Sequence, residues 1–121
     1  MIQYRAMRLY NWNTMQEEPL NPLLARKVIH TENLTIARLH LQKLAVVPRH
    51  HHVNEQITML ERGKLRFVFD DEQKIMEAGD ILQIPPQVPH MVEALEDSVA
   101  VDLFSPPRED WIRGDDTYLR K

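Results

Sequence analysis

The amino-acid sequence predicts an all-β protein, a sandwich or barrel of about eight to ten short strands. Apolar and polar residues alternate in short runs, such as residues 34–41 and 64–69, and this alternation is typical of strands with one buried face. Turn-forming residues recur about every six to ten positions. No segment keeps a helical period over three turns, so the pattern indicates packed sheets rather than a helical bundle.

The N-terminal part is expected to contain an arm, residues 1–22, followed by two strands. Residues 31–33 (Thr-Glu-Asn) are a turn signal that separates the two strands. The alternation in the second strand breaks at Ala37-Arg38, which indicates a bulge. The predicted segments are a short strand at 7–12, a polar loop with two prolines at 13–22, and strands at 23–30 and 34–41.

A further short strand is predicted at residues 44–47, and Pro48 is expected to end it because proline lacks a backbone N–H. The histidine-rich stretch 50–56 is interpreted as extended and continues into residues 57–60. Gly63 follows, and its tolerance of positive φ predicts a tight hairpin turn there.

The second half is predicted to contain strands separated by clear turn signals. Turns are expected at residues 70–72 and 78–80, and the three prolines of 85–89 form a stiff connector. One helical turn is predicted at 108–113, ended by Gly114. The predicted strands are 64–69, 73–76, 81–84, 90–94 and 98–104.

Composition limits the possible classes of protein. A length of 121 residues with 43% apolar residues suits one domain, residues 1–121, with a C-terminal tail at 105–121. A net charge of −3 without a basic stripe argues against nucleic-acid binding. No apolar run has the length of a membrane span or a signal-peptide core, so a cytoplasmic location is the simplest expectation. The chain has no cysteine, so any metal site must use histidine, carboxylate or amide ligands.

The histidine-rich stretch contains most of a metal site. In a strand, successive side chains point to opposite faces, so His50, His52 and Gln56 share one face. The alternative register offers only His51 and Glu55 as donors, and a one-residue slip exchanges the two sets. The first register supplies more ligands and is preferred, although a solvated polar loop would have a similar sequence.

Two parts of the chain resemble the two motifs of the cupin family. The stretch HHHVNEQ at residues 50–56, followed by Gly63, is similar to the first motif. The pair Gly-Asp at 79–80, followed by PPQVPH at 85–90, is similar to the second. The resemblance spans about residues 44–94 and implies the double-stranded β-helix, or jelly-roll barrel, of cupins. Because cupins host many chemistries, the motifs indicate the fold better than the reaction.

The resemblance also implies a metal site. Glutamate is the usual third ligand in cupins, but many small single-domain cupins have glutamine at the position of Gln56, where it binds the metal. The implied ligands are therefore His50, His52, Gln56 and His90, around a divalent transition metal such as nickel, manganese, zinc or iron. Gln87 departs from the glycine or asparagine that is common in the proline turn.

The segment VDLFSPPREDW at residues 101–111 resembles the tail of the small cupins that process unsaturated uronates from pectin and alginate. In that family an aspartate and a phenylalanine of the last strand and the arginine after it act at the site, and they match Asp102, Phe104 and Arg108. The implied function is conversion of a 4,5-unsaturated monouronate to its linear keto form, a lyase- or isomerase-type reaction on a small sugar acid. A metal-dependent dioxygenase and a non-catalytic ligand-binding module are the alternatives. Small cupins often pair, so a homodimer is expected.

Each of the three tail residues also has a purely structural interpretation. Asp102 interrupts an apolar run. Burial would raise its pKa and a nearby cation would lower it, which makes it a candidate general acid or base, but it could also face water on an edge strand. Phe104 could simply fill the core. Arg108 suits a substrate carboxylate because a guanidinium donates two parallel hydrogen bonds, or it could form a surface salt bridge with Glu109 or Asp110.

Other polar and aromatic residues are expected to be structural. His30 and His40 lie in predicted strands away from the motifs. Glu55 is expected to be a surface partner rather than a ligand. Trp111 and Tyr118 are expected to pack the tail against the barrel or against a partner subunit.

Overall fold

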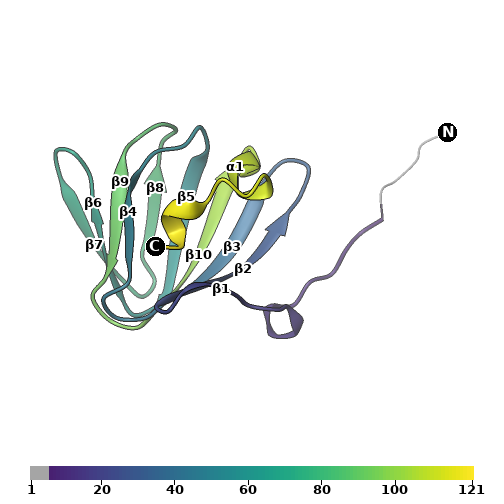
Figure 1. Cartoon of the computed structure of the whole chain (residues 1–121), viewed down its shortest axis with the longest axis horizontal. Coiled ribbons are helices and arrows are strands. Elements are labelled where there is room, and N and C mark those ends of the chain that lie inside the picture. Colours follow the sequence, from purple (N-terminus) through teal and green to yellow (C-terminus); the bar gives the residue numbers. More distant parts are fainter. Residues whose placement is uncertain (1–5) are drawn as a thin grey trace.

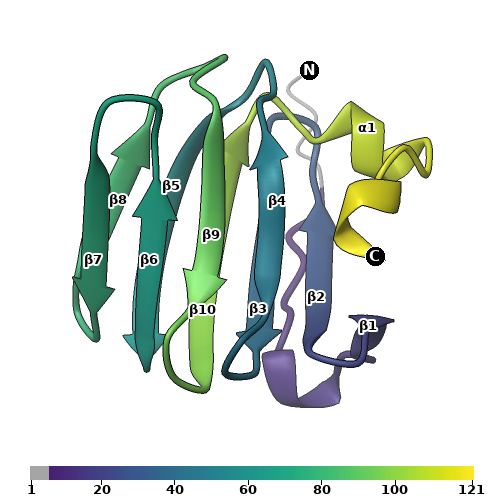
Figure 2. The ribbon, with the colours of Figure 1, turned by 60° about the vertical axis from the view of Figure 1, so that its left-hand side comes forward.

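The computed structural model describes residues 6–121, and its strands form two antiparallel sheets that face each other (Figures 1 and 2). The strands are β1 (Glu18–Asn21), β2 (Leu24–His30), β3 (Thr35–Leu41), β4 (Val46–His50), β5 (Glu55–Arg62), β6 (Lys64–Val68), β7 (Gln73–Glu77), β8 (Ile81–Ile84), β9 (His90–Ala94) and β10 (Ser98–Ser105). The short helices are η1 (Trp12–Thr14), α1 (Glu109–Ile112) and η2 (Thr117–Leu119). One sheet has the order β1-β2-β3-β10-β5-β8 and the other β4-β9-β6-β7. The all-β prediction is confirmed.

The apolar core lies between the two sheets. Side chains on β3 alternate between buried and half-buried, as expected for a strand with one face on the core. Full burial of a leucine or phenylalanine side chain contributes about 1.5–3 kcal/mol. Large side chains that are almost fully buried come from both sheets: Leu24, Leu65, Phe67 and Ile84. Within residues 6–121, no helix has the length and apolar character needed to cross a membrane.

Most of the predicted strands are present, but the predicted bulge at residues 37–38 is wrong. β3 keeps a continuous register with both β2 and β10. Ala37 faces the core and is fully buried, whereas Ile36 faces outward and is only half-buried. The apparent break in the sequence pattern therefore came from an apolar side chain on the outer face.

The N-terminal prediction is also wrong in detail. Residues 7–11 do not form a strand, because they have no partner strand within the described part of the chain. Residues 12–14 form η1, and the Asn11 side chain caps it by accepting a hydrogen bond from the Asn13 backbone N–H. The predicted loop 13–22 contains β1, which forms by pairing with β2. Residues 1–5 of the expected arm lie outside the described residues.

The stretch 50–56 is not one strand. β4 ends at His50 in the four-stranded sheet and β5 begins at Glu55 in the six-stranded sheet, so residues 51–54 connect the two sheets. Pro48 does not end β4, contrary to the prediction. β4 is an edge strand, and its register with β9 shifts between Val47 and His50. Proline is tolerated at an edge strand or a bulge because no ladder hydrogen bond is lost there.

Gly63 lies at a corner between sheets rather than in a hairpin. β5 and β6 belong to different sheets, and Gly63 joins them with a φ of +98°. A Cβ at this position would lie 2.2 Å from the Ser98 side-chain oxygen and 2.4 Å from the Asp97 carbonyl oxygen. Both the backbone and the lack of space therefore require glycine here.

Replacement of Gly63 by alanine is expected to lower the free energy of unfolding by about 2–5 kcal/mol, from the positive φ and the steric overlap together. Gly79→Ala is the matched control, since Gly79 has a φ of +96° but open space around the new Cβ. Its loss should stay near 1 kcal/mol. Urea unfolding of the two variants measures the difference, and equal losses would contradict the proposed close packing at the corner.

Candidate metal centre and acid–base site

Three histidines meet at one end of the space between the sheets. His50, the last residue of β4, lies opposite His90, the first residue of β9. His52 joins them from the connection between β4 and β5. One ring nitrogen of each lies within 4.8 Å of those of the other two, a spacing that suits one metal ion. The structure thus brings together the three histidines that the sequence prediction grouped, although a turn rather than a single strand does so.

The hydrogen bonds of the three rings leave one nitrogen of each free to bind a metal. In each ring Nδ1 bonds a backbone carbonyl oxygen, which only accepts, so Nδ1 carries the proton and Nε2 keeps its lone pair. Burial lowers the pKa of His50 to about 3, that of His52 to about 4, and also that of His90. All three are therefore neutral at pH 7. The partners are Pro48 for His50 (2.8 Å), Asn54 for His52 (3.0 Å) and Val88 for His90 (2.8 Å).

Gln56 adds an amide oxygen to the group. Its amide nitrogen donates to the Thr58 hydroxyl (2.9 Å), which turns its oxygen toward His52 Nε2 at 3.0 Å. With Nδ1 of His52 protonated, that oxygen and that nitrogen are two acceptors facing each other. A cation between them would satisfy both. The residues present therefore fit a divalent transition metal held by three imidazoles and one amide oxygen.

Asp102 lies beside this group. It pairs with Thr58 across β10 and β5, and the Thr58 hydroxyl donates to its carboxylate over 2.6 Å. Only 8% of Asp102 is exposed. Burial raises its pKa to about 6, against the opposing effects of the Thr58 hydrogen bond and the Arg108 charge. A carboxyl group that titrates near neutral pH can both accept and donate a proton during a reaction.

Arg108 and Phe104 contact each other at the same cavity, with the guanidinium carbon 4.6 Å from the Phe104 ring centre. Phe104 belongs to the core and also lines the cavity. The salt bridge of Arg108 with Asp110 exists, but its arginine is buried, with only 1% exposed, and its aspartate is half-buried. Asp110 accepts from both Nε and Nη2 (3.0 and 2.8 Å), so the edge expected to hold a substrate carboxylate is occupied. Nη1 makes no hydrogen bond to any residue of 6–121.

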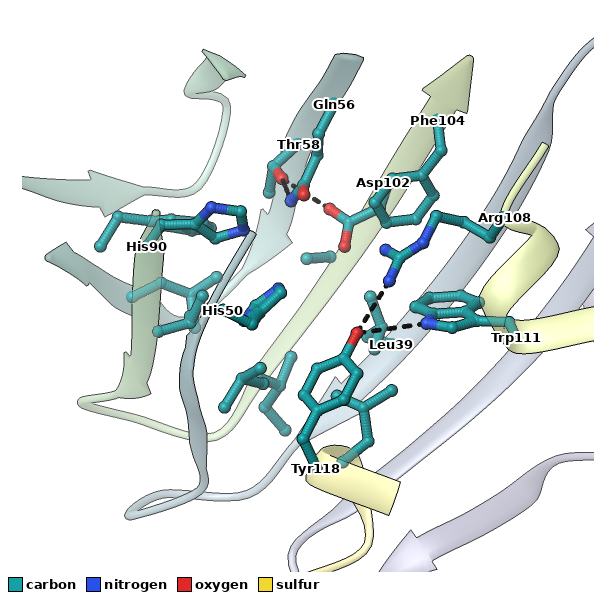
Figure 3. Close-up of a pocket in the computed structure, with 17 residues that line it drawn as sticks. Leu39, His50, Gln56, Thr58, His90, Asp102, Phe104, Arg108, Trp111 and Tyr118 are labelled. Atoms are coloured by element: carbon teal, nitrogen blue, oxygen red, sulfur yellow. Dashed lines mark hydrogen bonds between the residues drawn. The ribbon is translucent and has the colours of Figure 1, made fainter. Parts of the chain in front are cut away.

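These side chains surround a small cavity (Figure 3). Its volume is about 40 Å³, the space of a few water molecules. Tyr118 and Leu119 of η2 line it as well, and the C-terminal segment lies at the opening between the sheets (Figure 1). The polar and aromatic lining residues are His50, Gln56, Thr58, Phe67, His90, Asp102, Phe104, Arg108, Trp111 and Tyr118.

Three residues of the cavity were not predicted from the sequence to lie there: Thr58, Trp111 and Tyr118. Thr58 lies two positions after Gln56 on the same face of β5, so the parity that selected Gln56 also indicated Thr58. Trp111 and Tyr118 do pack the tail against the barrel, as predicted, but they also line the cavity. No periodic pattern marks them, because they lie in short helical turns.

The residues expected to stay outside the site do so. Neither His30 nor His40 lines the cavity, and His30 forms a hydrogen bond with Thr35. His51 is exposed. Glu55 is exposed as well and accepts a hydrogen bond from the side chain of Gln83 (2.9 Å), as expected of a surface residue.

Comparisons with known proteins agree with the fold. A family model described as a cupin domain matches residues 37–105. The pectin degradation protein KdgF from Dickeya dadantii is 32% identical over 98 residues, which cover 78% of this chain and 89% of that protein. The structure of KdgF from Halomonas sp. has a TM-score of 0.80 at 28% identity and covers 86% of this chain and 99% of that chain. An RmlC-like cupin from Shewanella frigidimarina has a TM-score of 0.80 at 24% identity, covers 88% of this chain and 96% of that chain, and shows likeness of fold alone.

Proposed function

The chain belongs to the cupin family, and from that premise we propose that it is a metal-dependent enzyme of pectin breakdown that converts a 4,5-unsaturated monouronate to its linear keto form. The observation that supports this most strongly is the position of Asp102. A buried carboxyl group with a pKa near 6 lines the same cavity as two histidines of the neutral triad. The similarity to a pectin degradation protein supports this substrate class.

His50, His52, His90 and Gln56 would hold the metal. When bound, it supplies a Lewis acid that stabilises negative charge on substrate oxygens. Four neutral protein ligands leave the full charge of the ion in place, and they leave room for substrate only at a five- or six-coordinate ion. Nickel, manganese and iron suit that requirement, as does zinc with an expanded shell.

Asp102 moves the proton in the proposed reaction. The substrate is a cyclic hemiacetal with a double bond between C4 and C5. Asp102 accepts the proton of the C1 hydroxyl, the bond between C1 and the ring oxygen breaks, and C1 becomes an aldehyde. The ring oxygen remains on C5 as an enolate, which becomes a ketone when Asp102 returns the proton to C4. One proton leaves and one returns, so the product is an isomer and no co-reactant is consumed.

Arg108 and Phe104 position the substrate in this proposal. The Arg108 side chain is fixed by Asp110 on one edge and by the aromatic rings of Phe104 and Trp111 at 4.6 and 4.3 Å from the guanidinium carbon. Its unpaired Nη1 therefore donates to the uronate carboxylate from a rigid side chain. Phe104 offers an apolar surface to the carbon–carbon double bond.

The metal-loaded protein is expected to remove the ultraviolet absorbance of an unsaturated monouronate, with the linear keto acid as product by NMR. Anaerobic conditions should leave the rate unchanged, because the reaction uses no oxygen. A requirement for oxygen would instead favour a dioxygenase. Stoichiometric binding without turnover would favour a non-catalytic binding module.

A further inference from the structure

Tyr118 brings a phenol group to the cavity from the far end of the chain. It lies in η2, and its ring centre is 4.8 Å from that of His50. Figure 3 shows its hydroxyl directed toward Arg108 and Trp111, and Asp102 lines the same pocket. Tyr118 lines the cavity with a polar group, and the reaction proposed above does not use it.

The hydrogen bonds of the Tyr118 hydroxyl leave its proton free. The oxygen accepts from Arg108 Nη2 at 2.8 Å and from Trp111 Nε1 at 3.3 Å. A hydroxyl oxygen has two lone pairs, and both are used by these donors. The O–H has no acceptor within residues 6–121, so it is available to a ligand. Two donors on one oxygen also polarise its O–H and strengthen the hydrogen bond that it donates.

An ion-pair network holds η2 in place. Asp116, two residues before Tyr118, is only 2% exposed and is paired with Arg26 of β2. Arg120 bonds the same carboxylate at 3.2 Å and Glu18 of β1 at 3.1 Å. Both sides of the turn that carries Tyr118 are thus tied to the six-stranded sheet, which limits the positions that the phenol can take.

The size of the cavity brings any substrate against Tyr118. A monouronate has about twelve non-hydrogen atoms and needs several times the space of a few water molecules, whereas the cavity holds about 40 Å³. A sugar acid that reaches Asp102 therefore packs against the Tyr118 side chain or displaces it. When Tyr118 keeps its position, its unpaired hydroxyl proton is therefore within reach of the substrate.

We propose that Tyr118 is a further catalytic residue, whose hydroxyl donates a hydrogen bond to the ring oxygen of the unsaturated uronate. This oxygen gains negative charge when its bond to C1 breaks, so the hydrogen bond strengthens as the ring opens. The proton stays on Tyr118 throughout, and the proton balance of the reaction is unchanged. The inference rests on the proposed function.

The test is Tyr118→Phe, which keeps the ring against His50 and removes only the hydroxyl. We expect kcat to fall about 100-fold, as for loss of one oxyanion donor, with a change in KM below about fivefold and an unchanged metal content. Tyr10→Phe is the matched control, because Tyr10 is exposed in the N-terminal segment and does not line the cavity. It should keep the rate of the unaltered protein.

Three results would overturn the inference. The first is a kcat of the variant within twofold of that of the unaltered protein, and the second is loss of metal from the variant. The third is a higher KM at constant kcat, which would mean that Tyr118 only holds Arg108 in place. If the unaltered protein itself turns over no unsaturated uronate, the proposed function fails separately. In that case, the Kd of D-galacturonate for the metal-loaded unaltered protein and for metal-loaded Tyr118→Phe tests whether the Tyr118 hydroxyl contacts a sugar acid. A Kd about fivefold weaker in Tyr118→Phe supports contact with the sugar acid, and equal Kd values exclude it.

Discussion

Replacing Asp102 by asparagine is expected to abolish turnover and, at neutral pH, to make the metal-free protein more stable. Burial raises the pKa of Asp102 from 3.8 to about 6. The folded state therefore binds the Asp102 proton more tightly than the unfolded state does, and stability falls as the pH rises from about 4 to about 6. The loss amounts to about 3 kcal/mol at pH 7. Asparagine cannot ionise, yet its oxygen still accepts from Thr58.

Urea unfolding at pH 7 and at pH 4 measures this effect. The variant should be more stable at pH 7, and the difference should shrink toward pH 4, because there the carboxyl group is protonated in the folded protein and about half protonated in the unfolded chain. The turnover of the unaltered protein should rise with pH and then level off, because the proposed base must be ionised. Equal stability of the two proteins at pH 7, or a variant with a tenth or more of the native rate, would contradict this role of Asp102.

Replacing His90 by alanine is expected to remove both the metal and the activity. His90 is 2% exposed, and its loss leaves two imidazoles and an amide oxygen, which bind a divalent ion much more weakly. Bound metal should fall from about one ion per chain to below about a tenth, and the rate at least about a thousandfold. His40→Ala on β3 is the matched control, since His40 is half-buried outside the cavity. Elemental analysis measures the metal content of the two variants. A His90→Ala protein that still binds metal and is active would show that His90 is not a ligand.

The composition of the metal group could be predicted from the sequence, but its geometry could not. Alternation selected His50, His52 and Gln56, and burial does alternate from His52 to Leu60. The backbone nevertheless crosses from one sheet to the other in the middle of this stretch. Alternation records which side chains face the interior, and it does not record which neighbouring strand supplies the hydrogen bonds. For the same reason the turn at Gly63 was identified while its role as a corner between sheets was not.

The contacts of the C-terminal tail could not be predicted from local sequence patterns. The sequence offered Arg108 as a donor to a substrate carboxylate, but it could not indicate that Asp110 already occupies one edge of the guanidinium. Tyr118 reaches the cavity because Asp116 pairs with Arg26, about ninety positions away in the chain. Such pairings depend on the folded positions of distant segments, so they leave no periodic signal.

Turnover of an unsaturated monouronate during stepwise addition of metal tests most directly whether one cavity combines a metal centre with a proton-transferring carboxyl group. The protein is first freed of metal with a chelator, and one divalent ion is then added in increments while the ultraviolet absorbance of the substrate is followed. We predict a rate that rises in proportion to bound metal and reaches its maximum at one ion per chain. A metal-free protein that is equally active, or a fully loaded protein that leaves the absorbance unchanged, would contradict the proposal.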